Sequence, residues 1–294
     1  MTLFKTLFLG LLLMTFTFSC AQNSQEVKID INKISGNVYM LVGQGGNIGV
    51  SIGDDGVFVI DDQFARLSPK IIAAIRTLSD KPIKFLANTH WHGDHTGGNV
   101  NFQKEGAIIM AHKNVRKRLE ESTNRDGSRN PKEALPIITF NDEMSLHMNG
   151  EEVAIFHPDN AHTDGDAILY FTESNVLHTG DTYFRGWYPY IDLESGGSVN
   201  GYIEAVKNTL MLIDDETKII PGHGPVSNKK EYKSFLVMME GLKGIIQAEI
   251  QKGKTEEQVT NDASLTKTYD DQGYSWNFIT SEKIRSTFYK SLKE

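Results

Sequence analysis

The stretch of this 294-residue sequence that most restricts its fold is Thr89-His90-Trp91-His92-Gly93-Asp94-His95. A short apolar segment at 83–87 precedes it and predicts a buried strand. Three imidazoles and one carboxylate then fall within six consecutive positions. Imidazole nitrogen and carboxylate oxygen are good zinc ligands, and a loop can turn such side chains towards different metal ions. The stretch therefore predicts a metal site at the end of a strand.

Three other candidate ligands, His162, Asp181 and His223, each follow a predicted strand. Active-site groups commonly gather at strand ends in α/β folds. A carboxylate such as Asp181 can bridge two ions, and two-metal sites place their ions about 3.5–4 Å apart. Together with residues 90–95, these three side chains predict a two-metal site.

Hairpins come first in the chain, and strands and helices then alternate. Asp54-Asp55-Gly56 joins two strand-like segments, as is typical of a hairpin. Apolar residues recur at helical spacing over 202–213 and 229–251, and the tail from 255 to 294 predicts two more helices. This order favours an α/β (α+β) fold in which two packed sheets carry helices on their outer faces. We expect one domain over residues 26–294.

The charge of the sequence restricts its partners. The formal net charge is −8, and no long basic run is present. A nucleic-acid backbone would require a stripe of Lys and Arg, so no nucleic-acid partner is expected. A small molecule is the expected substrate, and the oligomeric state stays open.

The N-terminal segment predicts export. Lys5 is followed by an uncharged run at 7–18 that is too short to span a bilayer comfortably. Residues 1–19 are therefore interpreted as a signal peptide, and residues 20–25 as a tether. We expect the protein in the periplasm of a bacterium or anchored to the outer membrane as a lipoprotein.

Two cleavage sites are compatible with this segment. Thr17-Phe18-Ser19-Cys20 resembles a bacterial lipobox, in which Cys20, the single cysteine, would become a lipid-bearing N-terminus. Cleavage after Ala21 is the alternative, since small residues precede it. We favour the lipobox, and the membrane would then be contacted only through a lipid on Cys20.

Four motifs in this order resemble those of the metallo-β-lactamase-fold hydrolase superfamily. They are Thr89 to Gly98, Ala161-His162-Thr163-Asp164-Gly165-Asp166, Thr179-Gly180-Asp181 and Pro221-Gly222-His223-Gly224. The resemblance spans the chain from Val27 to Val226. It implies a four-layer αββα sandwich with the metal ions at one edge of the paired sheets.

The resemblance also implies two Zn²⁺ ions, with iron or manganese left open as alternatives. The ligands of the two ions are, in order, His90, His92 and His162, then Asp94, His95 and His223. Asp181 would bridge the two ions. Asp61, at the end of a predicted strand, would orient their histidines.

The implied reaction is a hydrolysis in which a hydroxide bridging the ions attacks a carbonyl, with Asp94 holding and orienting the nucleophile. Asp181 departs from the β-lactamases of the family and favours esters, lactones or thioesters. A β-lactamase acting on β-lactam antibiotics is the first alternative, and an iron-bearing redox enzyme of the same fold is the second. An enzyme of the glyoxalase II type is disfavoured, because the tail offers no convincing basic motif for glutathione.

The aromatic segment after Asp181 is the candidate substrate pocket. Tyr183, Trp187 and Tyr190 occur there together with Arg185. Such a set could surround an apolar substrate that carries a negative group.

Overall fold

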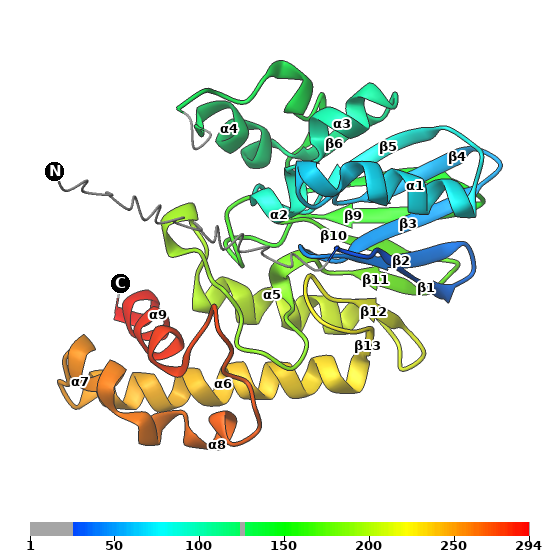
Figure 1. Ribbon diagram of the computed structural model, residues 1–294. Coiled ribbons are helices and arrows are strands. Elements are labelled where there is room, and N and C mark those ends of the chain that lie inside the picture. Colours follow the sequence, from blue (N-terminus) through cyan, green and yellow to red (C-terminus); the bar gives the residue numbers. More distant parts are fainter. Residues whose placement is uncertain (1–25, 124–126, 294) are drawn as a thin grey trace, which may run out of the picture.

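The computed structural model describes residues 26–123 and 127–293. The signal peptide and tether predicted at 1–19 and 20–25, including Cys20, lie outside these residues. In the part of the chain that is described, two sheets pack face to face and helices cover both outer faces (Figure 1). The mixed α/β fold with four layers is thus confirmed.

The first sheet runs in sequence order from β1 to β7, antiparallel up to β4 and parallel from β4 onward. Its strands are β1 (Asp30–Ser35), β2 (Val38–Val42), β3 (Ile48–Gly53), β4 (Gly56–Ile60), β5 (Ile83–Asn88), β6 (Ile108–His112) and β7 (Ile138–Phe140).

The second sheet has the strand order β13-β12-β11-β10-β9-β8, and its only parallel pair in the described residues is β11 with β12. Its strands are β8 (Glu143–Met148), β9 (Glu151–Phe156), β10 (Ile168–Phe171), β11 (Val176–His178), β12 (Lys218–Ile220) and β13 (Ser227–Asn228).

Helices account for the outer layers and the C-terminal region. The α-helices are α1 (Ser68–Leu78), α2 (Gly93–Thr96), α3 (Asn99–Lys104), α4 (Lys113–Glu121), α5 (Val199–Leu212), α6 (Lys229–Gln251), α7 (Glu256–Asn261), α8 (Lys267–Asp270) and α9 (Ser281–Lys293). Short 3-10 turns are η1 (Ala65–Leu67), η2 (Lys132–Ala134), η3 (Gly180–Thr182), η4 (Leu193–Ser195) and η5 (Ala263–Leu265). No α-helix of the described residues is both long and apolar enough to cross a membrane.

The core between the sheets is apolar on both sides. Phe58 and Ile60 of β4 share a buried cluster with Leu169 and Phe171 of β10. The rings of Phe58 and Phe171 lie 6.2 Å apart between centroids. Because side chains alternate along a strand, the other face of each sheet is free to pack against helices.

Two further clusters attach the helices. Ile71 and Ile75 of α1 are fully buried in the cluster that covers the outer face of the first sheet. Val206 of α5 and Met239 of α6 pack with Leu177 of β11 in the cluster on the second sheet. The helical spacing predicted over 202–213 and 229–251 therefore corresponds to buried stripes on α5 and α6.

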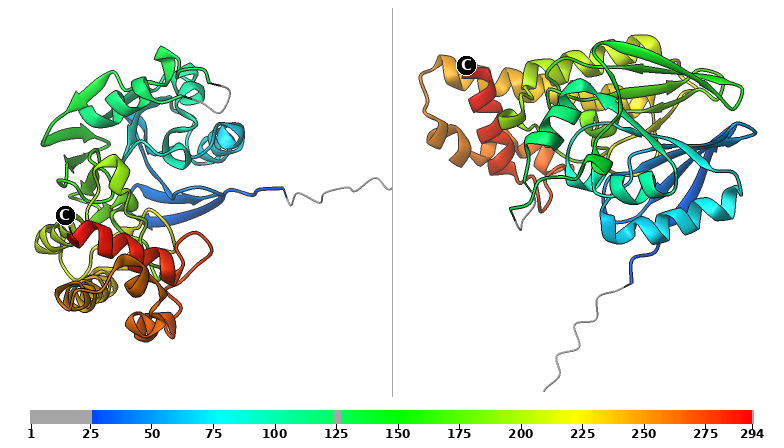
Figure 2. Two further views of the ribbon diagram at one scale, coloured as in Figure 1. Left: turned by 90° about the vertical axis from the view of Figure 1, so that its left-hand side faces the viewer. Right: turned by 90° about the horizontal axis from the view of Figure 1, so that it is seen from above.

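Two expectations need correction. Helix α5 begins at Val199 rather than at 202, because Ser198 accepts a hydrogen bond from the Gly201 backbone and caps the helix earlier. The tail forms three α-helices after α6 rather than two: α7, α8 and α9. Gly273 lies in the turn between α8 and α9, with a φ of 84°. Figure 2 shows α9 lying beside α6 in both views.

Candidate metal centre

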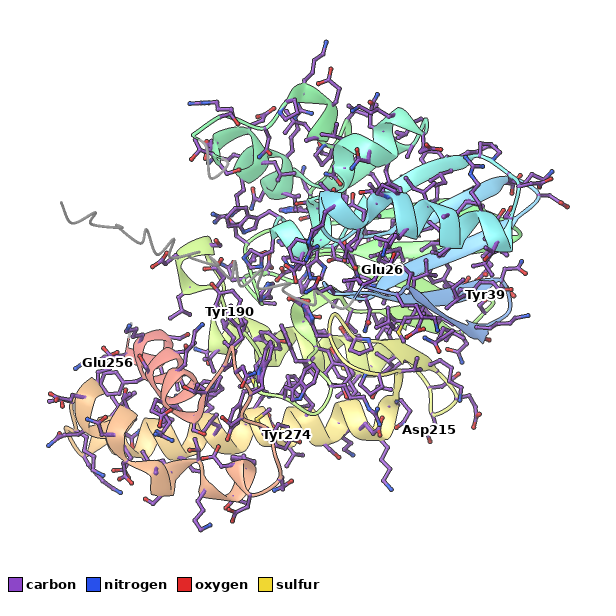
Figure 3. The ribbon with its side chains drawn as sticks, viewed as in Figure 1. Glu26, Tyr39, Tyr190, Asp215, Glu256 and Tyr274 are labelled. Atoms are coloured by element: carbon purple, nitrogen blue, oxygen red, sulfur yellow. The ribbon has the colours of Figure 1, made fainter. Side chains whose placement is uncertain are left out.

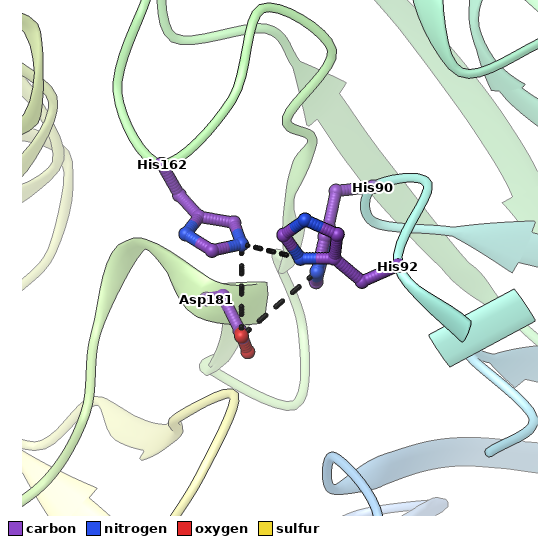
Figure 4. A group of neighbouring side chains, drawn as sticks. All are labelled: His90, His92, His162 and Asp181. Atoms are coloured by element: carbon purple, nitrogen blue, oxygen red, sulfur yellow. Dashed lines mark hydrogen bonds and ion pairs between the residues drawn. The ribbon is translucent and has the colours of Figure 1, made fainter. Parts of the chain in front are cut away.

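Loops at one edge of the two sheets carry the predicted ligands. Residues 90–95 follow β5 and lead into α2, whereas Asp181 lies in η3 directly after β11. His162 follows β9, and His223 follows β12. All seven predicted ligands are brought together in two groups, in each of which the ligand atoms lie within 4.8 Å of one another. The groups are His90, His92, His162 and Asp181 (Figure 4), and Asp94, His95 and His223.

Asp181 connects the two groups. Its Oδ2 lies 3.8 Å from Nε2 of His90 and 3.7 Å from Nε2 of His162 (Figure 4). The same oxygen is 3.4 Å from Nε2 of His223, and Oδ1 is 3.2 Å from Nε2 of His95. One carboxylate therefore reaches imidazoles of both groups, as the prediction of a bridging residue requires.

Each group also has short distances within it. Asp94 Oδ2 lies 3.4 Å from His223 Nε2 and 3.6 Å from His95 Nε2. His92 Nδ1 lies 3.0 Å from His162 Nε2. Donor atoms about 2.0–2.1 Å from a tetrahedral zinc ion are roughly 3.3–3.4 Å apart. The spacing in both groups therefore suits zinc.

Buried polar atoms without a partner provide an independent test of fit. His90 Nε2, His95 Nε2 and Asp181 Oδ1 are buried and have no hydrogen-bond partner in the described structure. Such groups normally find a partner, because an unsatisfied buried polar atom costs about 1–3 kcal/mol. All three point into the two ligand groups, where metal ions would satisfy them. The residues present thus fit metal ions.

Asp61 lies behind the ligands, as the resemblance implies. Its Oδ2 is 2.8 Å from Nδ1 of His95, which leaves Nε2 of that ring facing the centre. Asp61 also accepts hydrogen bonds of 2.7 Å from the backbone and hydroxyl of Thr89, the residue before His90. Its backbone φ of 62° lies in the left-handed region, a rare conformation that clusters at functional sites.

Two further groups that orient ligands were not predicted. His92 Nε2 is 3.0 Å from Asp192 Oδ2, and His162 Nδ1 is 2.8 Å from the carbonyl oxygen of Tyr190. In both rings the opposite nitrogen faces the metal site. Nothing in the sequence marks Asp192, because it lies a hundred residues after His92 and in no motif.

The electrostatics of the site favour ionised carboxylates. Burial alone would raise the pKa of Asp94, but the positive charges of His95 and His223 lower this pKa to about 2. Burial likewise opposes ionisation of Asp181, yet His223 and His95 hold its pKa well below the usual range. Both carboxylates are therefore available as anionic ligands at neutral pH.

Backbone packs directly against two ligands. A β-carbon on Gly46 would fall on the His95 ring, and one on Gly222 would fall on Asp181 Oδ1. Only glycine allows the chain to approach these side chains so closely. The signal for Gly222 was its place in the fourth motif, whereas Gly46 had no such signal.

A cavity of about 860 Å³ opens at the metal site. It is lined by metal-site residues, acidic and polar groups, and aromatic rings: Gln44, Trp91, His92, Asp94, Arg118, Asp181, Phe184, Tyr190, Asp192, Glu194, Ser195, His223, Trp276 and Phe278. Its size is that of a typical small-molecule site, about 300–1,000 Å³.

Of the three aromatics predicted for the pocket, only Tyr190 lines this cavity. Tyr183 is buried in the apolar core, where its hydroxyl bonds with Ser227. Trp187 lines a neighbouring cavity and stacks on Trp276. The prediction was wrong for Tyr183, whose ring faces the core. Trp187 lies beside the site, in a cavity that shares His223 with this one, so its role stays a prediction.

The cation proposed for this pocket is also engaged elsewhere. Arg185 forms an ion pair with Glu231 of α6, with 3.0 Å between Nε and Oε2. Phe184 lies beside the predicted ligands instead, stacked on the ring of His223 at 5.1 Å.

The fold and site define a metal-binding member of a known family. The model of the metallo-beta-lactamase superfamily matches residues 33–223, about two thirds of the chain, so this chain belongs to that superfamily. Its relatives include two hydroxyacylglutathione hydrolases. The protein from Pelagibacter ubique (strain HTCC1062) is 32% identical over 155 residues, which are 51% of this chain and 56% of that protein.

The other, hydroxyacylglutathione hydrolase GloC of Haemophilus influenzae, is 28% identical over 57% of this chain and 82% of its own length. A metallo-beta-lactamase type 2 of Bacillus sp. (strain 170) is 22% identical over 72% of this chain and 87% of its own length. The chain spans little more than half the length of the relative from Pelagibacter ubique.

Solved structures share the fold. A metallo-beta-lactamase from Pontibacter korlensis superimposes with a TM-score of 0.62 at 17% identity, over 72% of this chain and 99% of that one. The DIM-1 metallo-beta-lactamase gives a TM-score of 0.60 at 20% identity, over 73% and 99%. At such identities the likeness establishes the layered architecture and no substrate.

Proposed function

We propose that this protein is a hydrolase with two metal ions, zinc in the first instance, that cleaves a small ester, lactone or thioester. The observation that carries the proposal is the position of Asp181, whose buried carboxylate lies within 3.8 Å of imidazoles from both ligand groups. A carboxylate shared in this way is the usual bridge of a two-metal hydrolytic site.

Metal ions held there would act as Lewis acids and activate water near neutral pH. The protein's own residues hold and orient the reacting groups. Asp94 and Asp181 both line the cavity, but 28% of the Asp94 side chain is exposed against 5% for Asp181, so Asp94 can accept a hydrogen bond from an attacking water. Asp61 and Asp192 fix the rings of His95 and His92 from behind.

The order in which substrate classes are proposed follows from the relatives and from the shared carboxylate of Asp181. Two relatives carry the name hydroxyacylglutathione hydrolase, which brings glutathione thioesters forward although the tail of this sequence offers no evident basic motif for them. We therefore place thioesters first, followed by lactones and simple esters.

The experiment combines metal analysis with a substrate screen. We expect about two zinc ions per chain after zinc loading, and hydrolysis of at least one thioester, lactone or ester. Asp181→Asn keeps the shape of the side chain but removes its charge, and should lose one ion and at least about a hundredfold in kcat/KM. Asp215→Asn, in an exposed turn (Figure 3), is the matched control and should change neither. Full activity in the Asp181 variant would refute the proposal.

The same screen addresses the alternatives. The Bacillus metallo-beta-lactamase aligns with most of this chain, which keeps β-lactam hydrolysis as a second candidate. Turnover of nitrocefin without turnover of any ester or thioester would select it. Iron in the protein as isolated from cells, together with a failure of the zinc form to hydrolyse, would instead select the redox alternative.

We also propose that the protein is exported. The segment that predicts export lies outside the described residues, so the proposal rests on the sequence. We expect the protein in the membrane fraction, labelled by fatty acid at Cys20. Cys20→Ala should release it into the periplasmic fraction if the cleavage after Ala21 can replace the lipobox. A cytoplasmic location of both forms would contradict this.

A further inference from the structure

We infer that the segment from Tyr274 to Lys283 selects substrates whose acyl part carries a neutral aromatic ring. The inference rests on the proposed hydrolytic function and gives its substrate class. The segment lies beyond residues 33–223, which the superfamily model matches, so it is a feature added to the shared site.

The cavity at the metal site has an aromatic wall. Trp91, Phe184 and Tyr190 line it from the ligand-bearing loops, while Trp276 and Phe278 come from the C-terminal segment. Phe278 is 51% exposed although its ring is large and apolar. An exposed ring at the mouth of a concave site has apolar surface left to bury against a ligand.

The rings form a continuous surface that starts at the ligands. Tyr190 stacks on His92 at 5.6 Å and contacts Phe278 edge-on at 5.2 Å. Phe184, stacked on His223, lies 6.1 Å from Trp276, which is 5.6 Å from Phe278. If a substrate carbonyl lies at the metal site, a flat group attached to it and extending toward the cavity mouth would therefore contact these aromatic rings.

The wall is held in place before any substrate arrives. Trp276 Nε1 donates to the Tyr188 carbonyl at 2.9 Å, and the Tyr188 backbone donates to Tyr274 at 2.8 Å. Figure 3 shows Tyr190 and Tyr274 beside the C-terminal helices. The Tyr188 hydroxyl donates to Asp270 of α8 at 2.8 Å. Ring positions fixed in this way reduce the entropy lost on binding.

Charged groups beside the aromatic wall, Lys283 among them, restrict the charge of a ligand that binds there. Aromatic rings near carboxylates can form a cage for a cationic ligand. Here the Lys283 ammonium lies 4.1 Å from the centroid of the Phe278 ring and 5.1 Å from that of Tyr190, so the cation position is already occupied. Nζ of Lys283 also donates to the Phe278 carbonyl at 3.3 Å, which keeps it beside the ring, and its charge would repel a second cation. Asp192 and Glu194 line the same cavity and would repel an anionic ring, so a neutral ring is favoured.

The test compares three thioesters of the same thiol with the zinc-loaded protein. Their acyl groups are acetyl, phenylacetyl and a phenylacetyl with a trimethylammonium group on the ring. We expect kcat/KM for phenylacetyl to exceed that for acetyl at least about tenfold, because burying a ring in an apolar pocket discriminates by this order or more. The cationic analogue should fall below phenylacetyl.

Variants locate the selectivity in the segment. Phe278→Ala should lower the ratio of phenylacetyl to acetyl kcat/KM roughly threefold to tenfold, and Phe278→Leu should restore only part of this ratio. Lys283→Gln should raise turnover of the cationic analogue relative to phenylacetyl. Val237→Ala, at an exposed apolar position of α6, is the control and should alter no ratio.

A binding measurement separates the two proposals. Calorimetry with phenylacetate and acetate on the zinc-loaded protein reports on the wall without turnover. If no thioester, lactone or ester is cleaved but phenylacetate binds at least tenfold tighter and Phe278→Ala removes the difference, the hydrolytic function fails and the aromatic site stands. If thioesters are cleaved without preference and Phe278→Ala changes no ratio, the aromatic site is overturned and the hydrolase stands. Absence of both turnover and selective binding overturns both.

Discussion

The backbone of Gly222 packs directly against a predicted metal ligand. A methyl group there would collide with the Asp181 carboxylate and with the backbone of Gly180. We expect Gly222→Ala to displace the bridging carboxylate, lowering bound metal and reducing turnover by at least about tenfold. Metal content by mass spectrometry and kcat/KM measure this. Gly244→Ala is the control: it lies in α6 with open space around the new methyl group, so both values should stay unchanged.

Asp192 acts on the metal site only through His92. Burial opposes its ionisation, but the hydrogen bonds from His92 and Ser195 lower the pKa of Asp192 to about 2. Asp192→Asn keeps an oxygen for the Ser195 backbone but places an amide where His92 needs an acceptor. We expect metal affinity to fall roughly tenfold to a hundredfold, measured by competition with a chelator. Glu194→Gln, an exposed neighbour, should leave affinity unchanged; an unaltered affinity in Asp192→Asn would remove its assigned role.

At the scale of elements, the sequence predicts what local chemistry determines. His162, Asp181 and His223 could be placed in the site because each follows a strand after a short loop, and strand ends meet at one edge. Trp276 and Phe278 could not, since they reach the cavity through a turn between α8 and α9 whose course depends on long-range hydrogen bonds such as that from Trp276 to Tyr188. Spacing along the chain contains no information about those contacts.

The start of α5 offers an element-scale prediction. Ser198 Oγ accepts from the Gly201 backbone at 2.9 Å and donates to the Asn160 carbonyl at 3.0 Å, next to the loop that carries His162. Ser198→Ala should lower the free energy of unfolding by about 1 kcal/mol, the usual cost of losing an N-cap. Urea titration monitored by circular dichroism measures this. Ser234→Ala, exposed within α6, has no capping role and should change stability by less than about 0.5 kcal/mol.

At the scale of the whole molecule, the metal site joins the two sheets. His90, His92, Asp94 and His95 follow β5 of the first sheet, whereas the remaining ligands follow strands of the second: His162, Asp181 and His223. Each ligand group contains residues from both sheets, so bound ions would connect the two sheets at this edge. Buried imidazoles and carboxylates face one another there.

Removal of metal should therefore lower the stability of the entire fold. Ions present at about a hundred to a thousand times their Kd stabilise the native state by about 3–4 kcal/mol. For a chain of this size this corresponds to a rise in Tm of roughly 5–15 °C over the chelated protein. Differential scanning calorimetry before and after chelation, with metal content measured in parallel, gives the difference. Zinc should restore the original Tm, while Mg²⁺, which prefers oxygen ligands, should not restore it at the same concentration. An unchanged Tm in protein shown to be free of metal would mean that packing between the sheets alone holds the edge together.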